Sequence, residues 1–218
     1  MADLSATRWT LVQLAQAGDA KAIEALCGKY RPAIVSWLER RGLRGDAEDV
    51  AQEALLALVA SALQAAKAEA GSFRGLVFAV ARNKLLKHHE KANAAKRGAK
   101  KVQALGDLDP AMPTERDDDF DREWLANLTK RGLARLSEEH PSTYDVLRRF
   151  VLDGTPQAEI ARELSLPVDN VKKLVYRGKR KVAGYLRDEV WSYAISKKDY
   201  EAELAYLSRL LGEDVTGA

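Results

Sequence analysis

Lysine and arginine side chains gather in two stretches of the sequence, and the chemistry they suit is phosphate binding. The chain carries eight Lys/Arg against three acids from Thr155 to Arg187, and eight Lys/Arg against Glu90 alone from Arg82 to Lys101. Each phosphate that a cation neutralises releases a counterion, which favours binding to nucleic acid. A solvated basic face on a helical bundle is the alternative for either stretch.

The C-terminal basic stretch has the layout of a helix-turn-helix. Thr155 is predicted to cap a short helix that has Pro156 at its first position, with a turn at Ser165 and Leu166. A second helix then starts at Pro167 and is held against the first by three valines: Val168, Val171 and Val175. The second helix of this motif lies in the major groove of DNA. Its outward residues are therefore the candidates for DNA contact: Asp169, Asn170, Lys172, Lys173, Tyr176, Arg177, Lys179 and Arg180.

The other basic stretch continues a helix whose first half is apolar at helical spacing. Ser72 is the predicted cap, and the buried stripe runs from Phe73 to Leu85. Beyond that stripe, cationic residues alternate with amide and imidazole side chains that can reach bases or sugars. The candidates for DNA contact here are Arg82, Asn83, Lys84, Lys87, His88 and Lys91.

An acidic helix start precedes this basic helix. Asp46 is a predicted N-cap, with Asp49 at the capping-box position three residues on. Negative charge there favours the positive end of the helix dipole, so a solvated first turn explains the pattern. The alternative is an acidic face that docks on a basic partner, made of Asp46, Glu48, Asp49, Gln52 and Glu53.

Periodicity throughout the chain predicts an all-α protein of two helical modules. We expect a first module over residues 1–101, an acidic linker over 102–120, the helix-turn-helix module over 121–187 and a helical extension over 188–218. Eight acids between Asp107 and Glu123 indicate a solvated or disordered segment, or one that mimics DNA and shields a basic surface. The extension is expected to pack on the second module, with a partner surface as the alternative.

Composition limits the remaining function classes. The chain has 218 residues, of which 46% are hydrophobic and 31% are charged, and its net charge is +3. The single cysteine, Cys27, rules out an intramolecular disulfide and a cysteine-based zinc site. Signal-peptide, membrane-span and catalytic motifs are not seen. We therefore expect a cytoplasmic protein without catalytic residues, metal or cofactor, and without membrane contact.

Two separated motifs resemble a known family. DAEDVAQEALLAL followed by SFRGLVFAVARNKLLKHHEK resembles region 2 of the extracytoplasmic-function sigma factors of bacterial RNA polymerase. LARLSEEHPSTYDVLRRFVLDG and the stretch from Thr155 to Val182 resemble region 4 of the same factors. The two motifs occur in the family's order, on either side of an acidic linker.

The resemblance implies a role for each surface. The acidic face from Asp46 to Glu53 would dock on the clamp helices of the polymerase β′ subunit. The helix from Phe73 to Lys91, with Asn83 at the family's asparagine, would read and melt the promoter near the start site. The helix from Pro167 would read the distal promoter element, and its module would also touch the β flap.

The sequence departs from the family's pattern at three positions, and it also fits two rival functions. This chain has Leu76 where many members have tryptophan, Ser165 at the usual turn glycine and Pro167 at the usual serine or threonine cap. An anti-sigma factor is one expected regulator, and a kinase acting on Ser61 or Ser72 is another. The rival functions are a stand-alone helix-turn-helix regulator and a protein that sequesters polymerase or a sigma factor.

Overall fold

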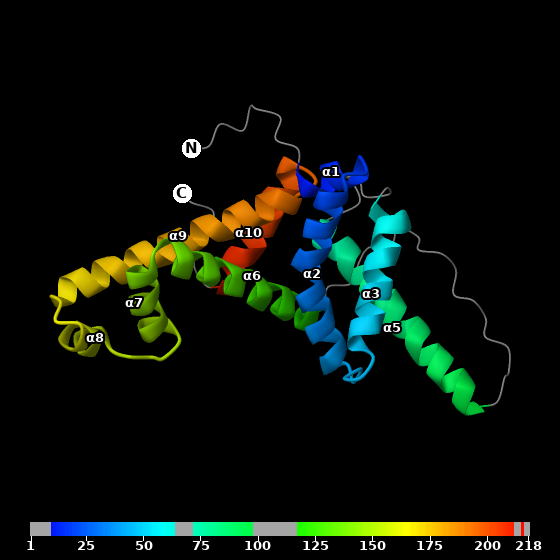
Figure 1. Cartoon of the computed structure of the whole chain (residues 1–218), viewed down its shortest axis with the longest axis horizontal. Helices are drawn as coiled ribbons and strands as arrows, with labels where there is room; N and C mark the ends of the chain where they lie inside the picture. Colours follow the sequence, from blue (N-terminus) through cyan, green and yellow to red (C-terminus); the bar gives the residue numbers. More distant parts are fainter. Residues whose placement is uncertain (1–9, 64–71, 98–116, 212–214, 216–218) are drawn as a thin grey trace. The chain divides into compact units, whose positions relative to one another are not determined.

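The chain folds into helices throughout the part that the computed structural model describes, namely residues 10–63, 72–97, 117–211 and 215. No strand occurs in these ranges, which confirms the predicted all-α class. The helices, shown in Figure 1, are α1 (Leu11–Gln16), α2 (Ala20–Arg40), α3 (Ala47–Ala57), the π-helical turn η1 (Leu58–Ala62), α5 (Phe73–Arg97), α6 (Asp118–Glu139), α7 (Pro141–Val151), α8 (Gln157–Glu163), α9 (Val168–Tyr193) and α10 (Lys197–Leu211).

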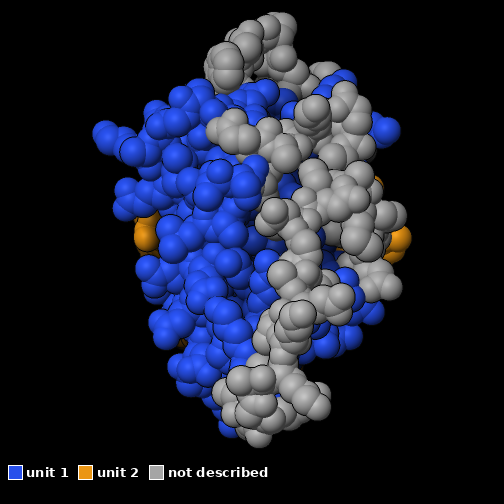
Figure 2. Space-filling view, turned by 90° about the vertical axis from the view of Figure 1, so that its right-hand side faces the viewer, with its two compact units in different colours: residues 1–125, 191–203 blue, residues 126–190, 204–218 orange. Residues whose placement is uncertain are grey.

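The helices divide into two compact units, and neither unit is continuous in sequence. Unit 1 comprises Met1–Leu125 and Trp191–Glu203, and unit 2 comprises Ala126–Val190 and Leu204–Ala218. Figure 2 colours the two units separately. We expected the C-terminal extension to pack on the second module, but its residues divide between the units.

Unit 1 begins with helix ends that the sequence predicts. The Asp19 carboxylate accepts the N–H of Ala22 at 2.9 Å and so caps α2. Gly42, which follows α2, has a φ of 94°, a left-handed conformation that glycine adopts without steric cost. Pro32 lies inside α2, which continues past it to Arg40.

Helices α2, α3 and α5 pack side by side around an aromatic core (Figure 1). Trp37 is 1% exposed, which confirms the expected core role, and its ring meets Phe78 at 5.5 Å between centroids. Tyr30 meets Phe73 edge-on at 5.7 Å. Such edge contacts add to the free energy gained from the buried area.

The acidic run is partly helical and bound, rather than solvated. Asp117 accepts the N–H of Phe120 at 3.0 Å and pairs with Arg41 at 2.5 Å. Glu123 pairs with Arg40 at 2.5 Å. The acids Asp117 and Glu123 therefore hold the start of α6 within unit 1. Residues 102–116 of the expected linker lie outside the described part of the chain.

Residues 191–203 complete the core of unit 1 from the other end of the chain. Tyr193 is 2% exposed and meets Tyr30 at 5.6 Å and Trp124 at 6.5 Å between ring centroids. Glu203 is buried and its carboxylate binds Arg74. The C-terminal extension thus supplies both aromatic and charged groups to the interior of unit 1.

Unit 2 has an aliphatic core between α6, α7, α8 and α9. Its buried residues are Leu136, Val146, Leu147, Ile160, Ala161, Val171, Val175 and Tyr185. Gly178 of α9 lies so close to α7 that an added Cβ would meet Leu147 Cδ2 at 3.2 Å and Thr143 Cγ2 at 3.3 Å. An added side chain at this position would therefore be tightly confined between the two helices.

The turn between α8 and α9 forms as predicted, although the ends of the helices are shifted. The N–H of Leu166 bonds to Ala161 O at 2.8 Å, and Ser165 between them has a φ of 54°. This is the helix end that usually has glycine at the left-handed position. The predicted Thr155 cap is wrong, because Pro156 is the N-cap of α8 and no side chain caps that end. Val168, expected inside, is 39% exposed.

Candidate functional site

The predicted acidic face lies exposed along the outer side of α3. All five of its residues are exposed, and the opposite side of the helix is buried through Val50, Ala54 and Leu55. Leu56 continues the face, since it follows Asp49 by two helical turns, and it is 64% exposed. The sequence analysis did not single out this exposed leucine.

Asp46 does not cap α3 as expected. Its carboxylate makes no cap hydrogen bond, so the predicted capping box with Asp49 is wrong. The carboxylate turns instead to His88 of α5, with Asp46 Oδ2 at 3.3 Å from His88 Nε2. A partner on another helix has therefore replaced the local backbone partner.

The acidic face and the basic side of α5 adjoin, which the sequence did not indicate. Glu53 pairs with Lys84 at 3.7 Å, parallel to the Asp46–His88 pair. Glu48 pairs with Arg31 of α2 at 3.0 Å. Within the described chain, Asp49 and Gln52 make no ion pair. These two residues and Leu56 form what we call the open part of the acidic face.

The candidate DNA-contact residues of α5 separate into two groups. Arg82, Lys87 and Lys91 are exposed. Asn83, Lys84 and His88 are half-buried, and the last two are the residues paired with α3. The side chains of residues 94–97 and all of residues 98–101, the end of the basic stretch, lie outside the description. Lys87 and Lys91 are thus exposed cations outside the two pairs with α3.

The outer face of α9 carries most of its predicted DNA-contact residues together. Tyr176 is 61% exposed, and the Arg180 guanidinium lies 5.8 Å from the centre of its ring. Lys172 pairs with Asp169 at 3.2 Å in the first turn. The other residues exposed on this face are Asn170, Lys173 and Arg177. An aromatic ring among exposed cations and amides suits contact with both bases and phosphates.

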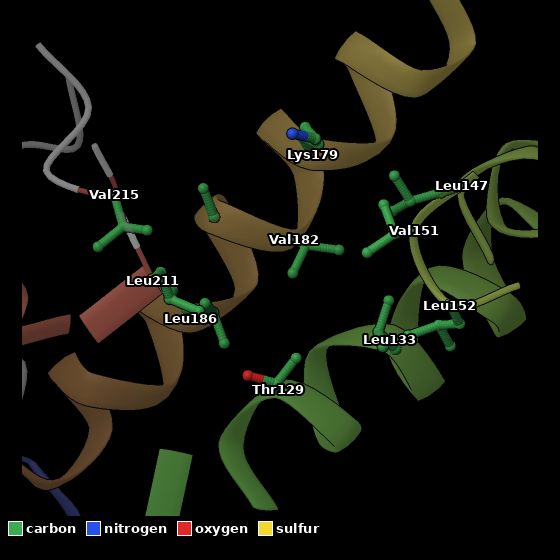
Figure 3. Close-up of a pocket in the computed structure, with 11 residues that line it drawn as sticks. Thr129, Leu133, Leu147, Val151, Leu152, Lys179, Val182, Leu186, Leu211 and Val215 are labelled. Carbon is green, nitrogen blue, oxygen red and sulfur yellow. The ribbon is translucent and has the colours of Figure 1, made fainter. Parts of the chain in front are cut away.

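Lys179 is the exception on α9. Its side chain is half-buried and lines an apolar groove in unit 2 (Figure 3). The groove has a volume of about 250 Å³ and is lined by Thr129, Leu133, Leu147, Val151, Leu152, Lys179, Val182, Ala183, Leu186, Leu211 and Val215. Val151 and Leu152 at the end of α7 are 53% and 60% exposed. The sequence analysis did not indicate this groove.

The described residues contain no group of His, Cys, Asp and Glu side chains that could hold a metal ion. Burial raises the pKa of the Cys27 thiol, which lowers its reactivity. None of the helices in the described ranges has the length and apolar character that crossing a membrane requires.

Two family models match the chain at these surfaces. Residues 26–95 match the model described as sigma-70 region 2, and this range includes α3 and most of α5. Residues 145–182 match the model described as sigma-70, region 4, which includes α8 and the first half of α9. The matches confirm the family resemblance and the order of the two regions. Among curated proteins, no significant match was found.

Proposed function

This chain belongs to the sigma-70 family of RNA polymerase sigma factors, and from that premise we propose that it is an extracytoplasmic-function sigma factor that brings core RNA polymerase to promoters and helps to open them. Sigma factors bind polymerase and DNA and are not enzymes. The site of action would be the cytoplasm, where polymerase works. The exposed acidic face of α3 beside the basic face of α5, in one unit, is the observation that carries the proposal.

The acidic face of α3 is the proposed contact with the β′ clamp helices. Asp49 and Gln52 are exposed and make no ion pair within the described chain, so binding a basic partner would not first require breaking an internal pair. Leu56 adds apolar area at the same surface. Asp46 and Glu53, already paired with α5, would be shared between the partner and this chain's own DNA-binding helix.

The two basic faces are the proposed promoter contacts. On α5, Arg82, Lys87 and Lys91 would follow the backbone near the start site, with Asn83 reaching a base. On α9, the first-turn residues Asn170 and Lys173 are placed to reach base edges of the distal element, because such a helix presents its N-terminal residues to the major groove. The other cations of α9 would anchor phosphates and position the helix.

The apolar groove of unit 2 is the proposed seat for the β flap. Val151 and Leu152 are exposed at its rim, and apolar side chains of a partner segment would cover them. Covering exposed apolar area contributes roughly 25 cal/mol per Å² before the costs of association. Leu152→Asp is expected to weaken flap binding without affecting DNA binding by α9.

The decisive experiment is co-elution with core polymerase on a size-exclusion column. Wild-type chain should co-elute, and Asp49→Arg should abolish co-elution because it places a cation against the proposed basic partner, at a residue that makes no ion pair within the described part of the chain. Glu24→Arg, at an exposed acid of another helix, α2, is the matched control and should co-elute normally. Failure of the wild type to co-elute would favour a stand-alone helix-turn-helix regulator.

Transcription from genomic fragments separates initiation from sequestration. A sigma factor should give discrete start sites, and sequencing them would identify the promoter. A chain that binds polymerase and never initiates would be a sequestering protein, and the proposed function would then be wrong.

Regulation by a kinase or by an anti-sigma factor is part of the proposal. Of the two hydroxyls expected to accept phosphate, Ser61 is exposed, whereas Ser72 is half-buried and caps α5 by accepting the Gly75 N–H at 3.0 Å. A phosphate on Ser61 would add about two negative charges roughly two turns beyond Glu53, the last acid of the face. Ser61→Asp should change the affinity for core polymerase, as measured by titration.

A further inference from the structure

The first turn of α5 contains a buried arginine that is held by two distant parts of the chain. Arg74 is 6% exposed, and its Nε lies 3.0 Å from Glu203 Oε2 of α10. Its Nη1 donates to the carboxylate of Asp121 in α6. The Trp124 ring covers the guanidinium, with its centre 4.8 Å from Arg74 Cζ. All four side chains belong to unit 1.

The start of α5 depends on these outside charges. Its first turn contains no acid and carries the Arg74 cation, although the N-terminal end of a helix favours negative charge. Gly75 in the same turn lowers helix propensity by about 1 kcal/mol relative to alanine. The carboxylates of Asp121 and Glu203 therefore supply from α6 and α10 the negative charge that the sequence of α5 lacks.

We infer that residues 191–203 of the C-terminal extension take part in promoter opening, by fixing the first turn of α5 through Arg74. Arg82 and Asn83 lie about two turns further along the same helix, so the direction of α5 sets where they meet DNA. Arg74 and Glu203 are positioning residues in this account, since neither would touch DNA. The inference rests on the proposed role of α5 in opening the promoter.

Conservative variants of the full-length chain test this inference. Glu203→Gln keeps the shape and one acceptor oxygen but removes the charge. Arg74→Lys keeps the charge but loses the planar fork that reaches two carboxylates at once. Glu201→Gln is the matched control, because Glu201 lies on the same helix, is exposed, and pairs with Lys197 at 3.7 Å.

Transcription on two DNA templates distinguishes a change in the position of α5 from general misfolding of the chain. One is a duplex promoter taken from the mapped start sites, with opening followed by permanganate reactivity of unpaired thymines. The other is the same promoter with its start region already mismatched and open. We expect Glu203→Gln and Arg74→Lys to slow opening of the duplex by about tenfold, while polymerase co-elution and transcription from the open template stay within about twofold of wild type.

Each result has one meaning for the inference. Wild-type rates of duplex opening by both variants would overturn it. Equal losses on the duplex and the open template would also overturn it, because general misfolding lowers both, and circular dichroism would identify that cause. If wild-type chain itself neither co-elutes with polymerase nor initiates, the proposed function fails instead.

Discussion

Unit 1 joins its distant segments with aromatic rings and buried charges, whereas unit 2 joins its helices with closely packed aliphatic side chains. The four buried charged residues of the described chain, Arg74, Asp121, Asp199 and Glu203, all lie in unit 1. The core of unit 2 is mostly leucine, isoleucine, valine and alanine, with Gly178 at a helix contact. Loss of the buried cation Arg74 should therefore damage unit 1 severely, while unit 2 should respond to small changes in volume.

The two units can be followed separately in solution. Trp37, Trp124 and Trp191 fall in the ranges of unit 1, and the ranges of unit 2 contain no tryptophan. Tryptophan fluorescence during urea unfolding therefore reports on unit 1, and far-ultraviolet circular dichroism reports on both units. The predictions below use this difference.

The largest expected effect is the loss of the buried cation in unit 1. Arg74→Ala leaves the carboxylates of Asp121 and Glu203 buried without their partner. Breaking a buried pair in this way costs about 3–5 kcal/mol. The tryptophan transition should move to lower urea by that amount. Arg122→Ala, which removes an exposed pair with Asp119, should cost under about 1 kcal/mol. Similar losses for the two variants would show that burial does not decide how much an ion pair contributes to the stability of unit 1.

A second buried charge makes unit 1 sensitive to pH. Burial raises the pKa of Asp199 to about 6, helped by Glu203 and partly offset by the Ile195 and Phe73 amides and by Arg74. Because the folded-state pKa lies above the unfolded value of 3.8, this group favours folding most below pH 4, and that contribution is lost as the pH rises towards 6.

Asp199→Asn should remove the free-energy cost of keeping a buried carboxylate ionised at neutral pH. The asparagine keeps an oxygen for the Ile195 N–H, which Asp199 Oδ2 accepts at 3.0 Å. We expect unit 1 to gain about 1–2 kcal/mol at pH 7.5 and little at pH 4. Urea unfolding followed by tryptophan fluorescence at both pH values measures the difference. A gain of the same size at pH 4 would show that ionisation of Asp199 is not the cause.

Local features of the fold could be predicted from the sequence because they depend on neighbours three or four residues apart. The Asp19 and Ser72 caps, the turn at Ser165 and the buried stripe of α3 are of this kind. The predicted Thr155 cap also depends only on near neighbours, and yet it was wrong. The N-cap of α8 is Pro156.

Contacts between distant residues could not be predicted in this way. The acids from 117 to 123 have the composition of a solvated linker, and their partners Arg40, Arg41 and Arg74 lie 47 or more positions earlier. The pairing of Asp46 with His88 crosses 42 positions between two surfaces that had been assigned separate partners. Composition and periodicity give the charge of a segment and its buried side, but they do not identify the opposite charge that it meets.

Unit 2 should be more sensitive to the volume of one methyl group. Gly178→Ala places a Cβ at 3.2–3.3 Å from Leu147 and Thr143, so α7 or α9 must shift. The cost should exceed the gain of about 1 kcal/mol from helix propensity and leave unit 2 about 1 kcal/mol less stable. Gly184→Ala on the same helix meets only Arg187 Nη2, at 3.7 Å, and should stabilise unit 2 by about 1 kcal/mol. Circular dichroism should therefore show shifts of opposite sign.

The smallest effect is expected at the turn of the helix-turn-helix, where Ser165 has a φ of 54°. A left-handed conformation costs a residue with a Cβ roughly 1 kcal/mol, and glycine avoids that cost but has more freedom to lose on folding. Ser165→Gly should thus stabilise unit 2 by about 0.5 kcal/mol and leave the tryptophan transition of unit 1 unchanged. Ser137→Gly is the matched control: Ser137 lies within the right-handed helix α6, so the same change should destabilise unit 2 by about 0.5 kcal/mol. If both substitutions destabilise unit 2, the left-handed conformation of Ser165 does not lower the stability of the turn. The serine side chain must then contribute a contact that glycine cannot replace.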